Sequence, residues 1–314
     1  MGTNLQIKKL ITEELKSSPS SMSHPPFDIV STPEFLREGT GIGDTTHPDR
    51  VLVGTENQKA AQVMLELHQP ISGERVVTDL ASAELIKYAS NSMLATKISF
   101  ANLISFYCEA TGANSEQVLK AVGLDNRIGP KFLNPGIGYG GACFPKDVKA
   151  LIHTGKQLGL DTSLLDGVES VNKQARDQFA DKIIKHAPGK KLGIWGLSFK
   201  PNTDDTREAP AFFIIEKLLQ AGFELTAYDP EASEHAKLKF GEQIKLVDDP
   251  YQVVESQDSL AIMTEWNEFK QIDLQKVKEL LNQPVIFDGR NLYELEQMQE
   301  LGFIYYSVGR QTVS

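Results

Sequence analysis

The stretch GIGYGGACFPKD, residues 136–147, places a cysteine directly after a run of glycines. Pro145 suits the first turn of a helix, because its missing N–H would be unpaired there in any residue. A thiol at a helix N-terminus beside Lys146 lies in a positive potential that stabilises negative charge on sulfur. The stretch alone supports two interpretations: Cys143 is a nucleophile, or it is a structural cysteine buried in a glycine-rich turn.

Two other pairs of residues have a spacing that suits catalysis. Glu34 and Glu38 would share one face of a helical turn, although a capping box from Ser31 to Glu34 explains the same residues more simply. Lys87 and Asn91 lie four apart in a helical pattern, where one side chain could stabilise an oxyanion while the other orients a substrate. The same spacing also suits an ordinary exposed helix face.

Basic side chains recur in loops that precede helices. Lys200 and Arg207 occupy the polar loop 200–208, ahead of a predicted helix whose first N–H groups would suit phosphate. The net charge of −10 argues against a nucleic-acid surface but leaves room for an anionic small molecule. Such a ligand requires a local cationic cluster, and we expect it to consist of Arg127, Lys131, Lys146, Lys200, Arg207 and Arg290.

Composition indicates an ordinary globular protein. The 314 residues are 40% hydrophobic and 24% charged, and no apolar run has the length of a membrane span. The N-terminal residues include acids and do not resemble a signal peptide. Two cysteines provide no disulfide framework, which favours the cytoplasm, and the six histidines lack metal-ligand spacing. We therefore expect neither a metal, nor nucleic acid, nor a membrane as a partner.

Hydrophobic periodicity predicts α/β structure in residues 1–78. It indicates an opening helix, a polar loop over 17–26, a helix over 57–68, and short strands at 27–30, 50–54 and 75–77. A dinucleotide-binding unit should contain G-x-G-x-x-G between a strand and a helix. Gly39, Gly41 and Gly43 have the wrong spacing, and the residues that follow them are not expected to be helical.

The character of the chain changes twice after residue 78. Residues 79–187 are predicted to be helical, with a long helix over 81–110, a helix capped by Ser115, and a connecting helix over 164–186. Residues 188–314 alternate strands and helices, which predicts a doubly wound parallel sheet with ligands at the carboxyl ends of its strands. Those ends place four residues near one rim: Gly196, Asp229, Thr264 and Arg290. Gly193-x-x-Gly196 is a weak nucleotide signal.

The order of these motifs resembles the UDP-glucose/GDP-mannose dehydrogenase family, of the bacterial UDP-glucose type, over nearly the whole chain. The matching stretches are FDIVSTPEFLREG, PDRVLVG, AELIKYASNSM, RIGPKFLNPGIGYGGACFPKDVKAL, GLSFKPNTDDTREAP and IFDGRNLYELEQMQELGFIYYSVGR. The resemblance implies three parts: the remnant of an N-terminal Rossmann-like NAD-binding domain (1–78), a central helical domain (79–187) and a C-terminal Rossmann-like UDP-sugar-binding domain (188–314).

The resemblance also implies a reaction, the NAD-dependent four-electron oxidation of UDP-glucose to UDP-glucuronate. Cys143 would be the covalent nucleophile and Lys87 the residue that stabilises the reacting oxygen. Asn91 and Asp147 would orient water and act as base, and Glu34 would assist thioester hydrolysis. The substrate would be bound by Glu38, Arg127, Phe132, Gly138, Gly141, Lys200 and Arg290, and the cofactor by Lys146 and Arg207.

The first residues depart from the family pattern. Family members open with a strand, G-x-G-x-x-G and a helix, whereas this chain resembles the segment that follows them. We therefore expect an N-terminal truncation, weak NAD binding, and turnover of UDP-glucose that is slow or absent. Expected partners are UDP-glucose, a second copy through the helical domain, and a separate chain that supplies the missing half. The alternatives are a non-catalytic UDP-sugar-binding remnant and a dehydrogenase for GDP-mannose or UDP-N-acetylmannosamine.

Overall fold

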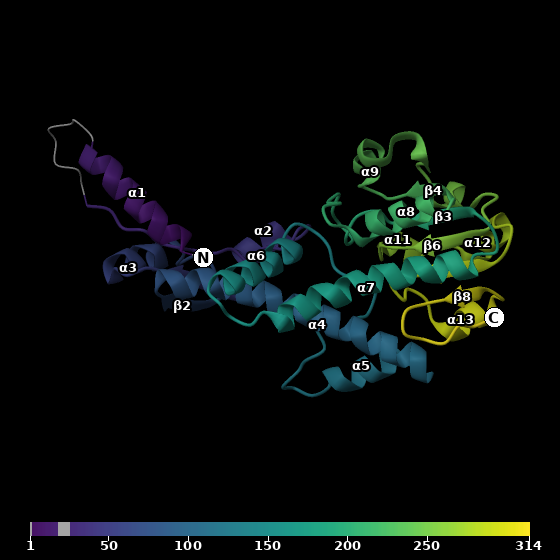
Figure 1. Cartoon of the computed structure of the whole chain (residues 1–314), viewed down its shortest axis with the longest axis horizontal. Helices are drawn as coiled ribbons and strands as arrows, with labels where there is room; N and C mark the ends of the chain where they lie inside the picture. The colour runs from purple at the N-terminus through teal and green to yellow at the C-terminus, as the bar shows by residue number, and fades with distance from the viewer. Residues whose placement is uncertain (1, 18–25) are drawn as a thin grey trace. The chain divides into compact units, whose positions relative to one another are not determined.

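A computed structural model describes residues 2–17 and 26–314 (Figure 1). Residues 18–25, which hold most of the predicted polar loop and His24, lie outside the described residues. Contacts group the chain into two compact units, Met1–Asn91 and Ser92–Ser314, and each is described by itself. The finer division at residues 78 and 187 stays a prediction.

The first unit is built around a two-stranded parallel sheet. β1 pairs with β2 in the register Leu52↔Val76, and α3 covers the pair through a small core of Val51, Val53 and Ala61. Asn57 caps α3 by accepting a hydrogen bond from the Lys59 amide. The elements are α1 (Thr3–Ser17), α2 (Gly41–Thr46), β1 (Arg50–Gly54), α3 (Gln58–Leu67), β2 (Glu74–Thr78) and the start of α4 (Leu80–Thr111).

Three local predictions for this unit are wrong. Residues 27–30 form no strand, and pairing is limited to one antiparallel bridge between Ser31 and Gly54. Residues 32–37 are not helical, so the capping box and the shared helical face of Glu34 and Glu38 are both absent. Gly41–Thr46 is helical, and Asp44 in this helix binds the Arg37 amide and guanidinium, a local contact that apolar periodicity does not reveal.

The second unit begins with helices. After α4 come α5 (Ser115–Gly123), α6 (Phe144–Gln157) and α7 (Ser163–His186), which confirms the helical character predicted for this stretch. The predicted cap of α5 is wrong by one residue. Asn114 is the N-cap and accepts hydrogen bonds from the Glu116 and Gln117 amides, whereas the Ser115 hydroxyl donates to the Val308 carbonyl.

A six-stranded parallel sheet follows, in the order β5-β4-β3-β6-β7-β8. This is the doubly wound order of dinucleotide-binding folds and confirms the predicted fold class. The strands are β3 (Lys191–Trp195), β4 (Glu224–Tyr228), β5 (Ile244–Leu246), β6 (Ser259–Ile262), β7 (Val285–Asp288) and β8 (Ile304–Tyr306). β8 was not predicted, although β5, which is equally short, was.

Helices cover both faces of this sheet. One buried cluster joins the sheet to α7, α8 (Pro210–Gln220) and α9 (Ser233–Phe240), with α7 packed along α8 (Figure 1). A second cluster joins the other face to α10 (Pro250–Val254), α11 (Asn267–Lys270), α12 (Leu274–Leu280) and α13 (Leu295–Glu300). No helix within the described residues is long and apolar enough to cross a membrane.

The carboxyl ends of the strands bring together the rim residues predicted from the sequence. A Cβ on Gly196, whose φ is +91°, would collide with Thr264, and the Arg290 Nε donates to the Met263 carbonyl at 2.8 Å. Asp229 accepts hydrogen bonds from the Leu197 amide at 2.7 Å, the Ser198 amide and the Trp266 indole. The amides of the turn after β3 therefore donate to Asp229, whereas in a nucleotide-binding turn they would donate to a phosphate.

Candidate active site

The glycine run before Cys143 is needed because other segments approach its backbone closely. Gly138 has a φ of +102°, and a Cβ there would lie 2.7 Å from the Asn172 side-chain oxygen on α7. A Cβ on Gly140 would collide with the Glu208 carbonyl. The loop is thus packed between α7 and the polar segment that precedes α8, and a side chain at either position would force them apart.

Cys143 caps the N-terminus of α6. Its carbonyl accepts the Asp147 amide at 2.9 Å, and Pro145 lies in the first turn, as predicted. The thiol is partly exposed, whereas the side chain of Asp147 is 1% exposed and pairs with Lys146 at 2.5 Å. The structure therefore holds a thiol and a buried carboxylate within one helical turn, in the positive potential of a helix N-terminus.

A cavity of about 1020 Å³ lies next to this loop, within the second unit. Four residues predicted to bind substrate line it together, although they are distant in sequence: Phe132, Gly138, Lys200 and Arg290. Gly138–Gly140 form part of its wall, and Phe144, adjacent to Cys143, forms another part. The cavity lies beside the carboxyl ends of the strands, where α/β sheets bind their ligands.

The lining of this cavity is cationic in a chain that is acidic overall. Five cations, Lys120, Lys131, Lys200, Lys270 and Arg290, face two carboxylates, Glu116 and Glu265. Four aromatic rings also line it: Phe132, Tyr139, Phe144 and Phe199. Phe144 meets Phe132 and Tyr139 edge-on, at centroid distances of 6.3 and 6.1 Å. Cations and rings together suit a ligand that carries phosphate at one end and a base or sugar at the other.

Buried groups fix the position of Arg290. Its amide donates to Asp288 at 2.8 Å, and its Nε lies 3.2 Å from Glu265. Burial raises the pKa of Asp288, which also accepts a 2.6 Å hydrogen bond from the Tyr305 hydroxyl. Arg310 donates to that hydroxyl in turn and pairs with Glu116 at the cavity wall. A chain of polar contacts therefore links the end of β7 to α5.

Several non-glycine residues in or near the same cavity have a positive φ, which is a strained backbone conformation. Phe132 and Asn291 line it with φ values of +65° and +53°. Glu208, whose carbonyl contacts Gly140, has a φ of +52°, and Asn202 in the same polar loop has +63°. Such conformations cost about 1 kcal/mol or more each and persist where the surroundings impose them, as at ligand sites.

The first unit unites two other predicted residues. The Lys87 Nζ donates to the Glu34 carbonyl at 2.6 Å and lies 3.3 Å from its Oε1, although the two are far apart in sequence. The ring of Phe35 lies under both the Lys87 ammonium and the Arg50 guanidinium. Asn91, one turn beyond Lys87 on α4, is buried. Glu38 lies in the turn that follows this segment.

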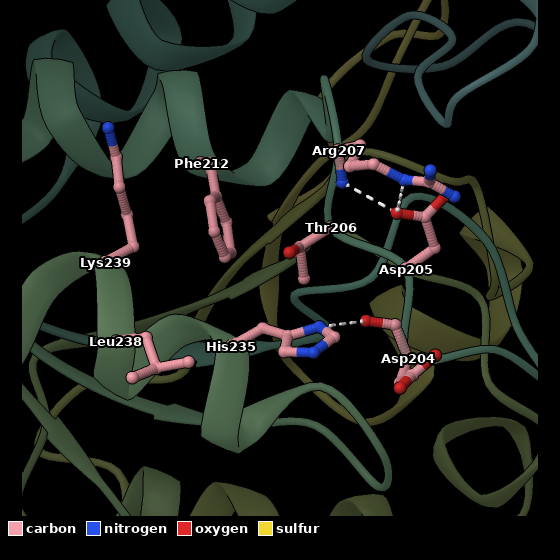
Figure 2. A pocket seen from close by; sticks show the side chains of 8 residues that line it. All are labelled: Asp204, Asp205, Thr206, Arg207, Phe212, His235, Leu238 and Lys239. Atoms are coloured by element: carbon pink, nitrogen blue, oxygen red, sulfur yellow. Dashed lines mark hydrogen bonds and ion pairs between the residues drawn. The ribbon is translucent and has the colours of Figure 1, made fainter.

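The predicted single cluster of cations is wrong in part. Arg127 is exposed and pairs with Asp125 at 2.6 Å, and Lys146 pairs with Asp147; neither lines the large cavity. Arg207 lines a second cavity of about 510 Å³, where its guanidinium binds Asp205 (Figure 2). Three of the six residues, Lys131, Lys200 and Arg290, share the large cavity.

The second cavity is shaped by the loop before α8 and by α9. In Figure 2, His235 lies to the left of Asp204, and its Nδ1 is 2.8 Å from the Asp204 carbonyl oxygen. Leu238 and Lys239 come from the same helix as His235 and face Phe212 across the hollow. Within the described residues, no group of His, Cys, Asp or Glu side chains could hold a metal ion.

Sequence patterns missed several residues that shape the large cavity. Lys120 and Lys270 lie in helices with no distinguishing motif, so nothing in the sequence marks them. Tyr139 stands between Gly138 and Gly140, and no sequence pattern marks it as a residue of the cavity wall. Asn172 lies in the middle of α7, where a buried asparagine has no helical role of its own.

Comparisons with known proteins agree with this site. Models of the UDP-glucose/GDP-mannose dehydrogenase family match three parts of the chain: the NAD binding domain at residues 1–72, the central domain at 81–174 and the UDP binding domain at 193–295. UDP-glucose 6-dehydrogenase TuaD of Bacillus subtilis is 46% identical over 316 residues, covering 100% of this chain and 67% of that protein. UDP-glucose 6-dehydrogenase of Rhizobium meliloti is 40% identical over 321 residues, with 99% and 71% covered.

A solved structure gives the same result. The UDP-glucose dehydrogenase of the archaeon Pyrobaculum islandicum superposes with a TM-score of 0.85 at 32% identity, covering 97% of this chain and 67% of that one. The chain spans about two thirds of the length of these relatives. The matches confirm the family resemblance, the Rossmann-like fold class and NAD as the cofactor of the N-terminal domain. The chain belongs to the UDP-glucose/GDP-mannose dehydrogenase family.

Proposed function

We propose that the protein acts in the NAD-dependent oxidation of UDP-glucose to UDP-glucuronate. The observation that carries the proposal is the large cavity, whose cations and aromatic rings gather beside Cys143's helix in a chain of net charge −10. Its walls come from spans that match the central and UDP binding domain models. The relatives named above are UDP-glucose enzymes, which favours UDP-glucose over GDP-mannose or UDP-N-acetylmannosamine.

In this proposal the cavity binds the nucleotide sugar. Lys200 and Arg290 pair with the diphosphate, since guanidinium and ammonium groups bind phosphate through charge-assisted hydrogen bonds. Phe132 packs against an apolar face of the ligand. The backbone of Gly138 and Gly141 contacts the hexose and brings its C6 hydroxymethyl group toward Cys143.

Cys143 supplies the covalent step. After the C6 alcohol has lost a proton and a hydride, the thiol sulfur adds to the aldehyde carbon and the thiol proton moves to the aldehyde oxygen, which gives a thiohemiacetal. Loss of that proton and a second hydride gives a thioester. Water then attacks the carbonyl carbon, the C–S bond breaks, and the thiolate leaves with its electron pair. When bound, NAD accepts one hydride in each oxidation.

The other residues of the proposal act on charge and water. Lys87 stabilises negative charge on the reacting oxygen, a role that suits a half-buried ammonium. Asn91 and Asp147 orient the attacking water and accept its proton, and Glu34 assists this hydrolysis. Glu38 and Arg127 complete the sugar site, Arg127 from a second copy of the chain.

The described residues fit NAD in part. Lys146 and Arg207 are exposed cations that suit a pyrophosphate, and they would hold it. Within the described part of residues 1–78, no glycine-rich turn connects a strand to a helix: β1 ends at Gly54, where a Cβ would collide with Ala83. The phosphate contacts of this proposal are therefore side-chain contacts, from Lys146 and Arg207.

A second copy would pack against α4. Met93, Phe100 and Tyr107 are exposed on this helix at intervals of seven residues, which places them on one stripe. An exposed apolar stripe of this length favours burial against an identical helix. Light scattering of the protein and of Phe100→Glu would test this, with a fall to monomer mass expected for the variant.

The test of the function is NADH formation from UDP-glucose and NAD, with Cys143→Ala as the control. We expect the unchanged protein to form NADH slowly, up to about two equivalents per sugar, as the two oxidations require, and the variant to form none. Calorimetric titration with UDP-glucose, GDP-mannose and UDP-N-acetylmannosamine would identify the nucleotide sugar. The proposal fails if UDP-glucose neither binds nor supports Cys143-dependent NADH formation.

A further inference from the structure

Asn172 on α7 binds both backbone groups of one residue in the glycine loop. Its Oδ1 accepts the Tyr139 amide at 2.8 Å, and its Nδ2 donates to the Tyr139 carbonyl at 3.1 Å. The side chain is 8% exposed. A primary amide is the one side chain that can donate and accept in the manner of a neighbouring strand, so Asn172 pairs with the loop as a strand would.

Asn102 on α4 binds the start of the same loop. Its Oδ1 accepts the Gly136 amide at 2.8 Å, and the side chain is fully buried. Its Nδ2 has no hydrogen-bond partner among residues 2–17 and 26–314. A buried amide with an unpaired donor is costly, and an apolar residue of similar size would avoid that cost. The bond to Gly136 is the contact that compensates for it.

The loop between these two asparagines has little means of holding its own shape. Glycine has the largest conformational freedom to lose, and the loop belongs to no strand or helix. Beyond the asparagines, the Tyr139 hydroxyl binds Glu169, and the Gly141 amide donates to the Arg207 carbonyl at 2.8 Å. Side chains from two helices therefore impose the conformation of the backbone that forms the cavity wall.

We propose that Asn102 and Asn172 are positioning residues that clamp the backbone of residues 136–140 from α4 and α7. The clamp holds this cavity wall in its ligand-binding shape before the ligand arrives, and it fixes the segment that leads into Cys143. The identity of the ligand, UDP-glucose, rests on the function proposed above. A preformed wall raises affinity because ordering of the loop does not oppose binding.

The two cysteines provide a readout that separates local loosening from general destabilisation. Cys143 follows the clamped loop, whereas Cys108 is 3% exposed in α4 and bonded to no part of it. We would measure the iodoacetamide reaction of each cysteine by peptide mass spectrometry in Asn172→Ala, Asn172→Asp and Asn102→Ala. Alkylation of Cys143 should accelerate by about fivefold or more in Asn172→Ala, because this variant loses two hydrogen bonds to the loop. The alkylation rate of Cys108 should stay unchanged. Asn172→Asp keeps the acceptor for the Tyr139 amide but sets a second acceptor oxygen against the Tyr139 carbonyl, so it should also accelerate alkylation of Cys143.

Asn282→Ala is the matched control. Asn282 also donates to a backbone carbonyl, that of Ser256 at 3.0 Å, but it precedes β7 and lies at the opposite end of the strands from Arg290. Its loss should leave both the Cys143 rate and the UDP-glucose affinity unchanged. In calorimetric titration, Asn172→Ala should bind UDP-glucose about tenfold more weakly than the unchanged protein.

The outcomes separate the clamp from the proposed function. Equal acceleration of both cysteines in the folded variants, or no acceleration of Cys143, would overturn the clamp. If the unchanged protein does not bind UDP-glucose, the proposed function fails, while the alkylation pattern still decides the clamp. If Asn102→Ala does not fold, the two Asn172 variants carry the same comparison.

Discussion

Residues 2–91 and 92–314 differ in how firmly they hold their chemical groups. In the second unit, Arg290 and Gly138 lie on segments tied to a six-stranded sheet with helices on both faces. In the first unit, a two-stranded sheet carries a small core, and α1 has no buried residue. Glu34 is 57% exposed in an extended segment that one bridge at Ser31 joins to β1.

The difference indicates that the residues proposed to bind the nucleotide sugar are held more firmly than those proposed to act on the reacting oxygen and on water. The cavity for the nucleotide sugar is preformed in the described structure, because buried asparagine and aspartate side chains fix its walls. The Lys87–Glu34 pair depends on an exposed carboxylate and one carbonyl contact, which are weak restraints in water. Ligand binding should therefore be more robust to mutation and pH than catalysis.

The largest expected contrast is in hydrogen exchange of the full chain. Amides of β3 and β6, central in the large sheet, should exchange at least about a thousandfold more slowly than those of α1, because exchange there requires opening of the main core. Amides of β1 and β2 should be intermediate. Mass spectrometry of peptides would measure this, and protection of α1 within about tenfold of β3 would contradict the contrast.

Removal of Arg290 should have the next largest effect. Arg290→Ala removes a fixed guanidinium from the cavity and should weaken UDP-glucose binding by about 30- to 100-fold, the effect expected of a hydrogen bond to a charged group. Arg37→Ala, which breaks the exposed 2.5 Å pair with Asp44 in the first unit, is the control and should leave affinity unchanged. Calorimetric titration measures both. Equal losses in the two variants would show that the cavity is not the binding site.

The smallest effect concerns pH and lies at the amino ends of the central strands β3 and β6. A hydrogen bond from Asn282, together with the Lys191 amide, holds the pKa of Asp258 below its ordinary value of 3.8. A carboxyl with a lower pKa in the folded chain than in the unfolded chain stabilises the fold above pH 3.8, and this contribution is lost as pH falls through the folded-state value.

Asp258→Asn should therefore lower the melting temperature at pH 7 by about 1–2 °C, because the group is partly exposed and its contribution is screened. The difference from the unchanged protein should shrink as pH falls from 3.8 through the lower folded-state pKa of Asp258, below which the carboxyl of the folded protein is protonated as well. Calorimetric scans at both pH values measure this. A difference that grows on acidification would show that the sign of the shift is wrong.

The sequence alone determined the main elements and the candidates for chemistry. Periodic apolar residues identified the long helices α4 and α7 and the principal strands of the large sheet, because burial of one face imposes its period on the sequence. The order of motifs identified the family, and it drew attention to Cys143 before any contact was known. The short elements α2 and β8 escaped, because apolar periodicity marks neither the Asp44–Arg37 contact of α2 nor the pairing of β8 with β7.

Only the tertiary structure decided which candidates meet. Phe132, Lys200 and Arg290 share a cavity, and Lys87 meets Glu34, because helix packing and strand order bring distant segments together. Arg127 and Arg207, equally plausible by sequence, bind neighbouring aspartates away from that cavity. The glycine run is explained by the segments that approach its backbone, above all by Asn172. The burial of this polar side chain in α7 is explained in turn by its two hydrogen bonds to Tyr139. The periodicity of a sequence indicates which face of a helix or strand is buried, whereas the tertiary fold determines which segment packs against that face.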